Sequence, residues 1–153
     1  MTSNHGLFLK VAAVLWVIWG LVHMLAGVLT MAQDASGAVA GIADAVDPAL
    51  IGDNFHPAVG AVLNQHGFNL FWIGAFTVVG AVLIWRASVT AIFMTAIVGW
   101  VTDVGYFWFM DLGGFVNFVP GTVMTLVSSA AVVFSFWAYF KGMRSAGGTG
   151  STV

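Results

Sequence analysis

Four long apolar segments dominate this sequence, at residues 7–32, 58–85, 89–110 and 117–140. About 20 consecutive apolar residues are enough for a helix to cross the hydrocarbon core of a bilayer. Inside lipid a helix satisfies its own backbone hydrogen bonds, whereas an irregular segment leaves them unmade. The pattern therefore predicts an all-α integral membrane protein, built as a four-transmembrane-helix up-down bundle.

The charge content supports a bilayer as the main partner of this chain. Only 7% of the residues are charged, whereas soluble domains carry about 25%. So few charged side chains could not cover a water-facing surface. The net charge of −2 gives no reason to expect nucleic-acid binding. Because cysteine is absent, disulfides and thiolate metal sites are excluded.

The polar stretches divide the chain into one domain and a tail. Residues 33–56 form a sizeable loop with four aspartates, in which residues 38–46 are expected to make a short surface helix. Two very short turns join the later apolar segments. We therefore predict a single four-span domain over residues 1–144, and a disordered Gly/Ser/Thr-rich tail over residues 145–153.

The first apolar segment has an alternative interpretation as a secretory signal peptide, with residues 38–40 as its cleavage site. The length of the segment argues against that interpretation. Trp16, Trp19 and His23 are also unusual within the apolar region of a signal peptide.

The basic residues predict the orientation of the bundle. With four spans, Lys10, Arg86, Lys141 and Arg144 all fall on the same side of the membrane. The positive-inside rule assigns that side to the cytoplasm. We therefore expect a multi-pass protein of the inner membrane, with both termini cytoplasmic and the loop 33–56 outside.

Ionisable residues lie away from the ends of two predicted spans, His23 in the first and Asp103 in the third. Such residues are costly in hydrocarbon and are by default a functional-site hypothesis. Counting 1.5 Å per residue from Lys10 and Arg86 puts His23 about 20 Å and Asp103 about 25 Å from the basic side. We therefore expect a direct or water-bridged contact between His23 and Asp103.

Other polar and aromatic side chains fall at similar depth, and helical spacing gathers them into stripes. We predict an outward-facing intramembrane pocket made by His23, His66, Asn69, Trp100, Asp103, Tyr106 and Thr125. His23 and Thr125 also have a purely structural interpretation, whereas a lone carboxylate such as Asp103 needs either a proton or a partner. A buried histidine commonly packs with its hydrogen bonds satisfied, and a threonine in a helix commonly bonds its own backbone.

Such a pocket suits a ligand-holding protein for a lipid, a quinone or a pigment. The chain could equally be an accessory subunit of a larger membrane complex, or form a homo-oligomer. We predict a non-enzymatic role with no catalytic residues. Ser128 and Ser129 lie outside any G-x-S-x-G elbow, and no phosphate-binding glycine loop is present.

The alternative function is a metal- or haem-binding redox protein that uses His23 and His66. Imidazole suits copper, zinc and iron, and two histidines can ligate a haem axially. Their estimated depths differ by about 10 Å, which argues against one shared ion. A proton pathway through His23, Asp103 and Tyr106 is a third hypothesis. Against this hypothesis, the sequence provides no ionisable residue to continue such a pathway through the cytoplasmic half of the spans.

Overall fold

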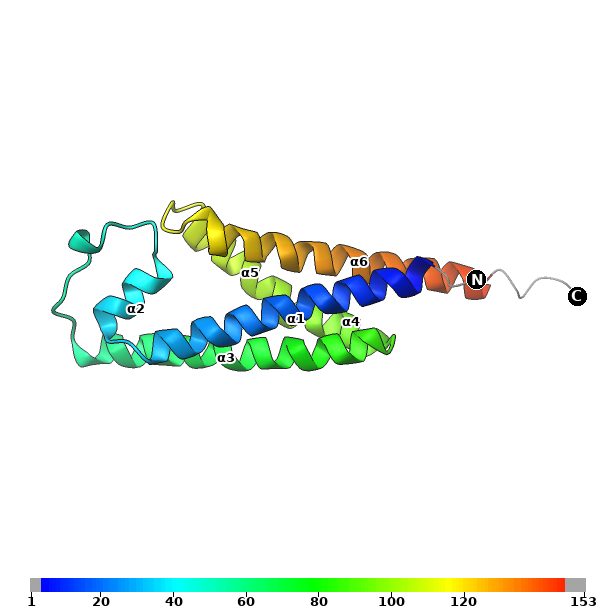
Figure 1. Ribbon diagram of the computed structural model, residues 1–153, viewed down its shortest axis with the longest axis horizontal. Coiled ribbons are helices and arrows are strands. Elements are labelled where there is room, and N and C mark those ends of the chain that lie inside the picture. The colour runs from blue at the N-terminus through cyan, green and yellow to red at the C-terminus, as the bar shows by residue number, and fades with distance from the viewer. Residues whose placement is uncertain (1–3, 148–153) are drawn as a thin grey trace, which may run out of the picture.

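Each apolar segment of the sequence forms a long helix in the computed structural model, which describes residues 4–147. The helices run along the long axis of the molecule (Figure 1), and no strand occurs among residues 4–147. One wide π-helical turn divides the third span, and a second ends it. The segment before the last helix is kinked, because the backbone of Val119 is extended there. The elements are α1 (Asn4–Met31), α2 (Ala35–Ile42), the 3-10 turn Pro48–Leu50, α3 (Pro57–Trp85), α4 (Val89–Thr95), the π turn Ala96–Trp100, α5 (Val101–Tyr106), the π turn Phe107–Asp111, the kinked segment Phe118–Thr122, and α6 (Val123–Gly147).

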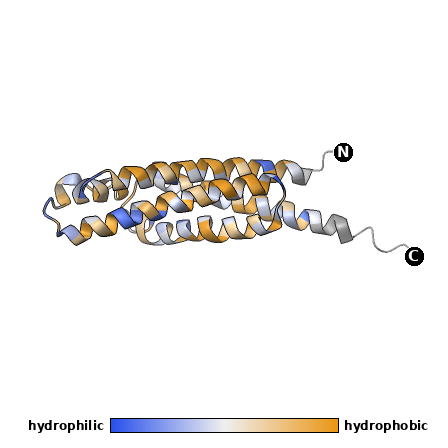
Figure 2. Ribbon diagram, turned by 90° about the horizontal axis from the view of Figure 1, so that it is seen from below, coloured by the Kyte–Doolittle hydropathy of each residue, from blue (hydrophilic) through white to orange (hydrophobic). Residues whose placement is uncertain are grey.

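Four helical segments within the described residues are long and apolar enough to cross a membrane. Their bounds are Gly6–Met31, Pro57–Trp85, Val89–Asp111 and Phe118–Gly142. Figure 2 shows hydrophobic residues along the length of the bundle. The prediction of an all-helical chain with four span-length apolar helices is therefore confirmed.

Glycines bring α1 and α3 into close contact. A Cβ atom built on Gly20 would lie 2.6 Å from the carbonyl oxygen of Gly74, and one built on Gly67 would lie 2.8 Å from that of Gly27. Both distances are far below van der Waals contact, so a larger residue would push the helices apart. Close approach over small residues is the usual way in which apolar helices associate in lipid. We call the close contact of α1 with α3 over Gly20, Gly27, Gly67 and Gly74 the glycine seam.

Two tryptophans of α1 fill the interior of the bundle. Trp16 and Trp19 are fully buried, with their rings in an edge-to-face arrangement at 5.7 Å. The outer faces of the helices carry large apolar side chains instead, such as Leu25 at 59% exposure and Phe109 at 71% exposure. An outside as apolar as this is suited to lipid contact.

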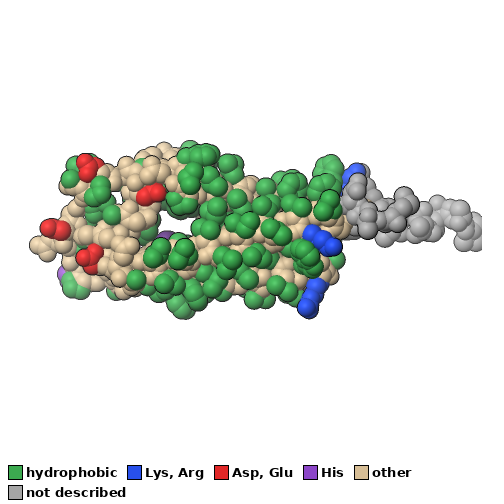
Figure 3. Space-filling model, viewed as in Figure 1, with side chains coloured by type: hydrophobic (Ala, Val, Ile, Leu, Met, Phe, Trp, Pro, Cys, Tyr) green, Lys and Arg blue, Asp and Glu red, His purple; other side chains and the backbone are tan. Residues whose placement is uncertain are grey.

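The two ends of the bundle differ in charge. Figure 3 shows basic side chains at one end and acidic ones at the other. Lys10 and Lys141 lie over the rings of Trp85 and Trp137, at 5.4 and 5.2 Å from the ring centroids. The side chain of Arg144 lies outside the described residues, and so does most of the predicted tail, since α6 extends to Gly147.

The loop between α1 and α3 lies at the acidic end and is fastened there (Figure 1). Its short helix, α2, begins earlier than predicted, because the carboxylate of Asp34 caps it by accepting from the backbone N–H of Gly37 at 2.8 Å. Farther along, Asp44 accepts from the backbone N–H of Asn117 at 2.7 Å. The Asn117 side chain in turn donates to the Asp44 carbonyl oxygen at 2.9 Å. The loop is therefore tied to the segment that precedes α6.

Candidate functional site

A cavity of about 520 Å³ opens at the acidic end of the bundle. The surface is hollowed there, between the loop and the helices (Figure 3). Much of its wall is apolar, contributed by Val22, Leu29, Ile42, Leu70, Met110 and Met124. The polar side chains that line it are His23, Thr30, Gln33, Asp44, His66, Thr102, Asp103 and Tyr106.

Asp103 of α5 is the most buried polar group in this wall, at 2% exposure. Its Oδ2 atom accepts two hydrogen bonds, one from Trp19 Nε1 at 2.6 Å and one from Ser128 Oγ at 2.5 Å. The donors come from α1 and α6, so the carboxylate joins three helices. A buried carboxylate needs such partners, because its removal from water is otherwise uncompensated.

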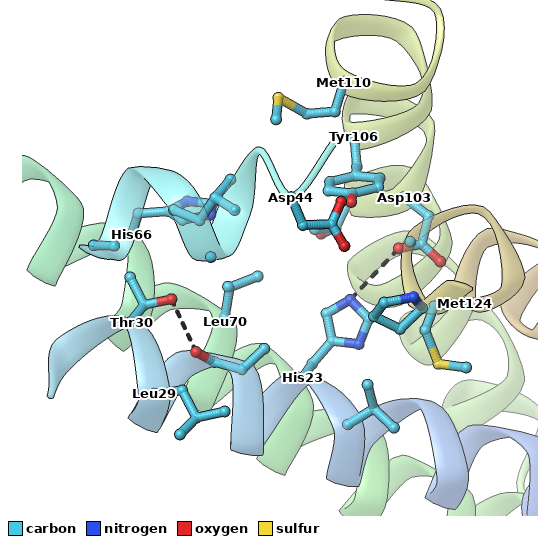
Figure 4. A pocket seen from close by; sticks show the side chains of 18 of the residues that line it. His23, Leu29, Thr30, Asp44, His66, Leu70, Asp103, Tyr106, Met110 and Met124 are labelled. Atoms are coloured by element: carbon cyan, nitrogen blue, oxygen red, sulfur yellow. Dashed lines mark hydrogen bonds and ion pairs between the residues drawn. The ribbon is translucent and has the colours of Figure 1, made fainter. Parts of the chain in front are cut away.

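His23 lies beside this carboxylate, as Figure 4 shows. Its Nδ1 atom is 2.9 Å from the carbonyl oxygen of Trp19. Because a carbonyl can only accept, Nδ1 carries the proton of that hydrogen bond. Nε2 faces Asp103 Oδ1 at 3.7 Å. The expected contact between His23 and Asp103 is therefore present, at a distance longer than a hydrogen bond.

The local sequence explains how these side chains meet. Trp19 and His23 are four residues apart on α1, so they share one helical face. Their rings stack with centroids 3.6 Å apart and planes 20° apart. Stacking on a fully buried tryptophan fixes the orientation of the imidazole. Both rings thus present hydrogen-bonding atoms to Asp103.

Tyr106 lies one helical turn beyond Asp103, on the same wall of the cavity. A Cβ atom built on Gly121 would lie 2.6 Å from the Tyr106 hydroxyl. The absence of a side chain at Gly121 therefore leaves room for the tyrosine. Within residues 4–147 the Tyr106 hydroxyl has no hydrogen-bond partner.

Four of the seven residues predicted for the pocket line this cavity, namely His23, His66, Asp103 and Tyr106. These four side chains do not form a single cluster. His66 lies at the opposite end of the cavity from the His23–Asp103 pair (Figure 4).

The other three predicted residues, Asn69, Trp100 and Thr125, lie outside the cavity wall. Asn69 accepts a hydrogen bond from Trp72 of its own helix at 3.1 Å. Trp100 ends the π turn before α5, and this wider turn departs from the regular spacing on which the stripe was based. Its indole N–H donates to Ser129 at 3.1 Å. The Thr125 hydroxyl is buried without a hydrogen-bond partner in the described part of the chain.

Sequence reasoning missed four polar residues of the cavity wall, namely Thr30, Gln33, Asp44 and Thr102. Asp44 is one of four aspartates in the loop, and only its bonds to Asn117 distinguish it. Gln33 lies two residues after the end of α1, where it looks like an ordinary boundary residue. A long-range contact with Asn117, which one sequence cannot display, brings Asp44 to the cavity.

The two histidines of the metal hypothesis, His23 and His66, lie at opposite ends of the cavity (Figure 4). Among residues 4–147, no group of three or more His, Cys, Asp or Glu side chains comes together as a candidate metal site. One nitrogen of His23 is already bonded to a backbone carbonyl.

Comparisons of this chain with protein-family models, with curated proteins and with solved structures give no match.

Proposed function

We propose that this chain is a multi-pass inner-membrane protein that holds an apolar ligand with a polar head in the cavity near its outer surface. The observation that carries the proposal is the cavity itself. Its volume of about 520 Å³ lies in the range of small-molecule sites, about 300–1,000 Å³. Mostly apolar walls with a few convergent polar groups are also typical of such sites.

The charge difference between the two ends supports the orientation. Lys10 lies near the start of α1, Arg86 just after α3 and Lys141 near the end of α6. Basic side chains gather at the end of the bundle opposite the acidic ones (Figure 3). Under the positive-inside rule that end is cytoplasmic. Both chain termini are then cytoplasmic, and the cavity faces outward.

A role as an accessory subunit rests on the exposed aromatic residues, such as Trp108 and Phe109 at 66% and 71% exposure. Lipid would cover these side chains as well as a partner helix would. The cavity combines an apolar wall with a few convergent polar groups, which is more specific than exposed aromatic residues, so ligand holding is the better-supported role. The metal or haem hypothesis is weaker, because His66 lies far from the His23–Asp103 pair (Figure 4).

A substitution that fills the cavity tests the proposal. Gly105 lines the cavity, and a Cβ atom built on it meets nothing within 4 Å. Leucine at this position would therefore extend into open space without a clash at its base. Gly60 is a matched control, because its Cβ position is equally open and it lies outside the cavity wall.

The experiment is purification in a mild detergent, followed by mass spectrometry of the small molecules that stay bound. We expect the unsubstituted protein and Gly60→Leu to retain the same compound near one per chain. Gly105→Leu should lose it. Identical extracts from all three proteins would mean that the cavity holds nothing specific.

A further inference from the structure

The geometry around His23 leaves two hydrogen-bond acceptors facing each other. Nδ1 is the donor to Trp19, so in the neutral imidazole Nε2 carries a lone pair. That atom is 3.7 Å from Asp103 Oδ1. The other carboxylate oxygen already accepts from Trp19 and Ser128. Nε2 and Oδ1 thus lack a donor between them.

The cavity around this pair carries negative charge and no positive residue. Asp44 and Asp103 both line it, whereas no lysine or arginine does. The described basic side chains lie at the far end of the bundle. Charges in a cleft with low-dielectric walls act strongly on a ligand of opposite sign. An anionic head group would meet repulsion here, and a cationic one would meet attraction.

Building on the ligand-holding function proposed above, we propose that the natural ligand is an amphiphilic amine, whose primary or secondary ammonium group binds between Asp103 Oδ1 and His23 Nε2. A single nitrogen can lie at about 2.8 Å from both atoms, because they are 3.7 Å apart. Two of its N–H groups then satisfy both acceptors. The apolar remainder of the ligand packs against Leu29, Leu70 and Met110.

A bound proton is the competing occupant of the same gap. A proton on Nε2 makes an imidazolium–carboxylate pair, which is neutral overall and has no preference for a cation. The other titratable groups that line the cavity are Asp44 of the loop, His66 of α3 and Tyr106 of α5. Because these groups surround every probe in the same way, a comparison of head groups measures the contribution of the His23–Asp103 pair.

The test uses three probes with the same phenylalkyl body: 4-phenylbutylamine, 4-phenylbutan-1-ol and 5-phenylpentanoate. At pH 7.5 the amine is cationic and the acid is anionic. Binding to the full chain is measured by equilibrium dialysis in an uncharged detergent. We expect the amine to bind about tenfold more tightly than the alcohol, as is typical for hydrogen bonds to a charged group. The acid should bind most weakly.

Two variants test whether the His23–Asp103 pair causes the preference for the amine over the alcohol. Asp103→Asn retains a carbonyl acceptor for Trp19 and Ser128 but loses the charge, so the amine should lose its advantage while the alcohol is unaffected. His23→Phe retains a ring to stack on Trp19 but removes Nε2, and it should weaken amine binding alone. Should Asp103→Asn fail to fold, the three-probe comparison on the unsubstituted protein still decides.

The outcomes separate the two proposals. Equal binding of the amine and the alcohol would overturn the amine assignment and leave the ligand-holding function intact. Tighter binding of the acid would do the same. Binding of none of the three probes would count against both proposals.

Discussion

The indole N–H of Trp19 donates a 2.6 Å hydrogen bond to the carboxylate of Asp103, a residue 84 positions away in the chain. Both side chains are buried. This bond ties α1 to α5, and the Ser128 hydroxyl ties the same carboxylate to α6. The polar centre of the bundle is therefore a structural link as well as a wall of the cavity.

Removal of this donor should destabilise the protein. Trp19→Phe deletes the N–H and retains an aromatic ring, so Asp103 retains only Ser128 as a donor. We expect a loss of about 1.5–3 kcal/mol, which is typical for a hydrogen bond to a charged group. Thermal unfolding in detergent, followed by circular dichroism, measures it. Trp72→Phe is the control, because the Trp72–Asn69 hydrogen bond is exposed. Equal effects of the two substitutions would contradict the assigned importance of the Asp103 contact.

The His23–Asp103 contact predicts non-additive energetics. In the ligand-free protein a proton on Nε2 pairs the imidazole with the carboxylate. His23→Leu alone then leaves the buried carboxylate without this partner, and Asp103→Leu alone leaves the imidazole without it. The double variant removes both partners together. We expect its loss of stability to be smaller than the sum of the single losses by at least about 0.5 kcal/mol. Additive losses in the same unfolding assay would show that the two side chains are not coupled.

The glycine contacts between α1 and α3 predict that added volume is tolerated at Gly60 of α3 and not at Gly20 of α1. Gly20→Ala places a methyl group against the Gly74 carbonyl, and overpacking of this kind costs about 1–3 kcal/mol. At Gly60 a Cβ atom meets nothing within 4 Å. Gly60→Ala should be neutral or stabilising by up to about 1 kcal/mol, because alanine favours helix. Unfolding midpoints of the two variants test the contrast, and a stable Gly20→Ala protein would argue against the close seam.

The proposed orientation predicts which cysteines can be labelled from outside the cell. The sequence has no native cysteine, so a single introduced thiol gives a clean signal. Asp53→Cys, in the exposed loop, should react with a membrane-impermeant maleimide on intact cells. Thr90→Cys, near the basic end and also exposed, should react only after the cells are opened. The opposite pattern would invert the topology.

The spans could be predicted from sequence because their signal is local. Each apolar segment must satisfy its own backbone bonds in lipid, so length and composition alone identify it. The predicted and observed bounds of the span-length helices accordingly differ by no more than two residues. The approach of His23 to Asp103 was also predictable, because few partners exist for a carboxylate at that depth.

The cavity wall was less predictable, for two physical reasons. Assignment of Trp100 to the Asp103 face assumed a regular helix, whereas the π turn at Ala96–Trp100 changes the rotation there. Asp44 reaches the cavity because a loop folds back onto Asn117. Neither a change of helical pitch nor a loop contact of this range leaves a pattern in one sequence.

The glycine seam also determines which part of the molecule can adjust to a ligand. Backbone lies against backbone along α1 and α3, so these two helices cannot move closer together. α5 and α6 meet α1 at the cavity through side chains, and side chains can change rotamer. The α1–α3 pair is thus a rigid frame, and ligands of different widths would be accommodated by the opposite wall.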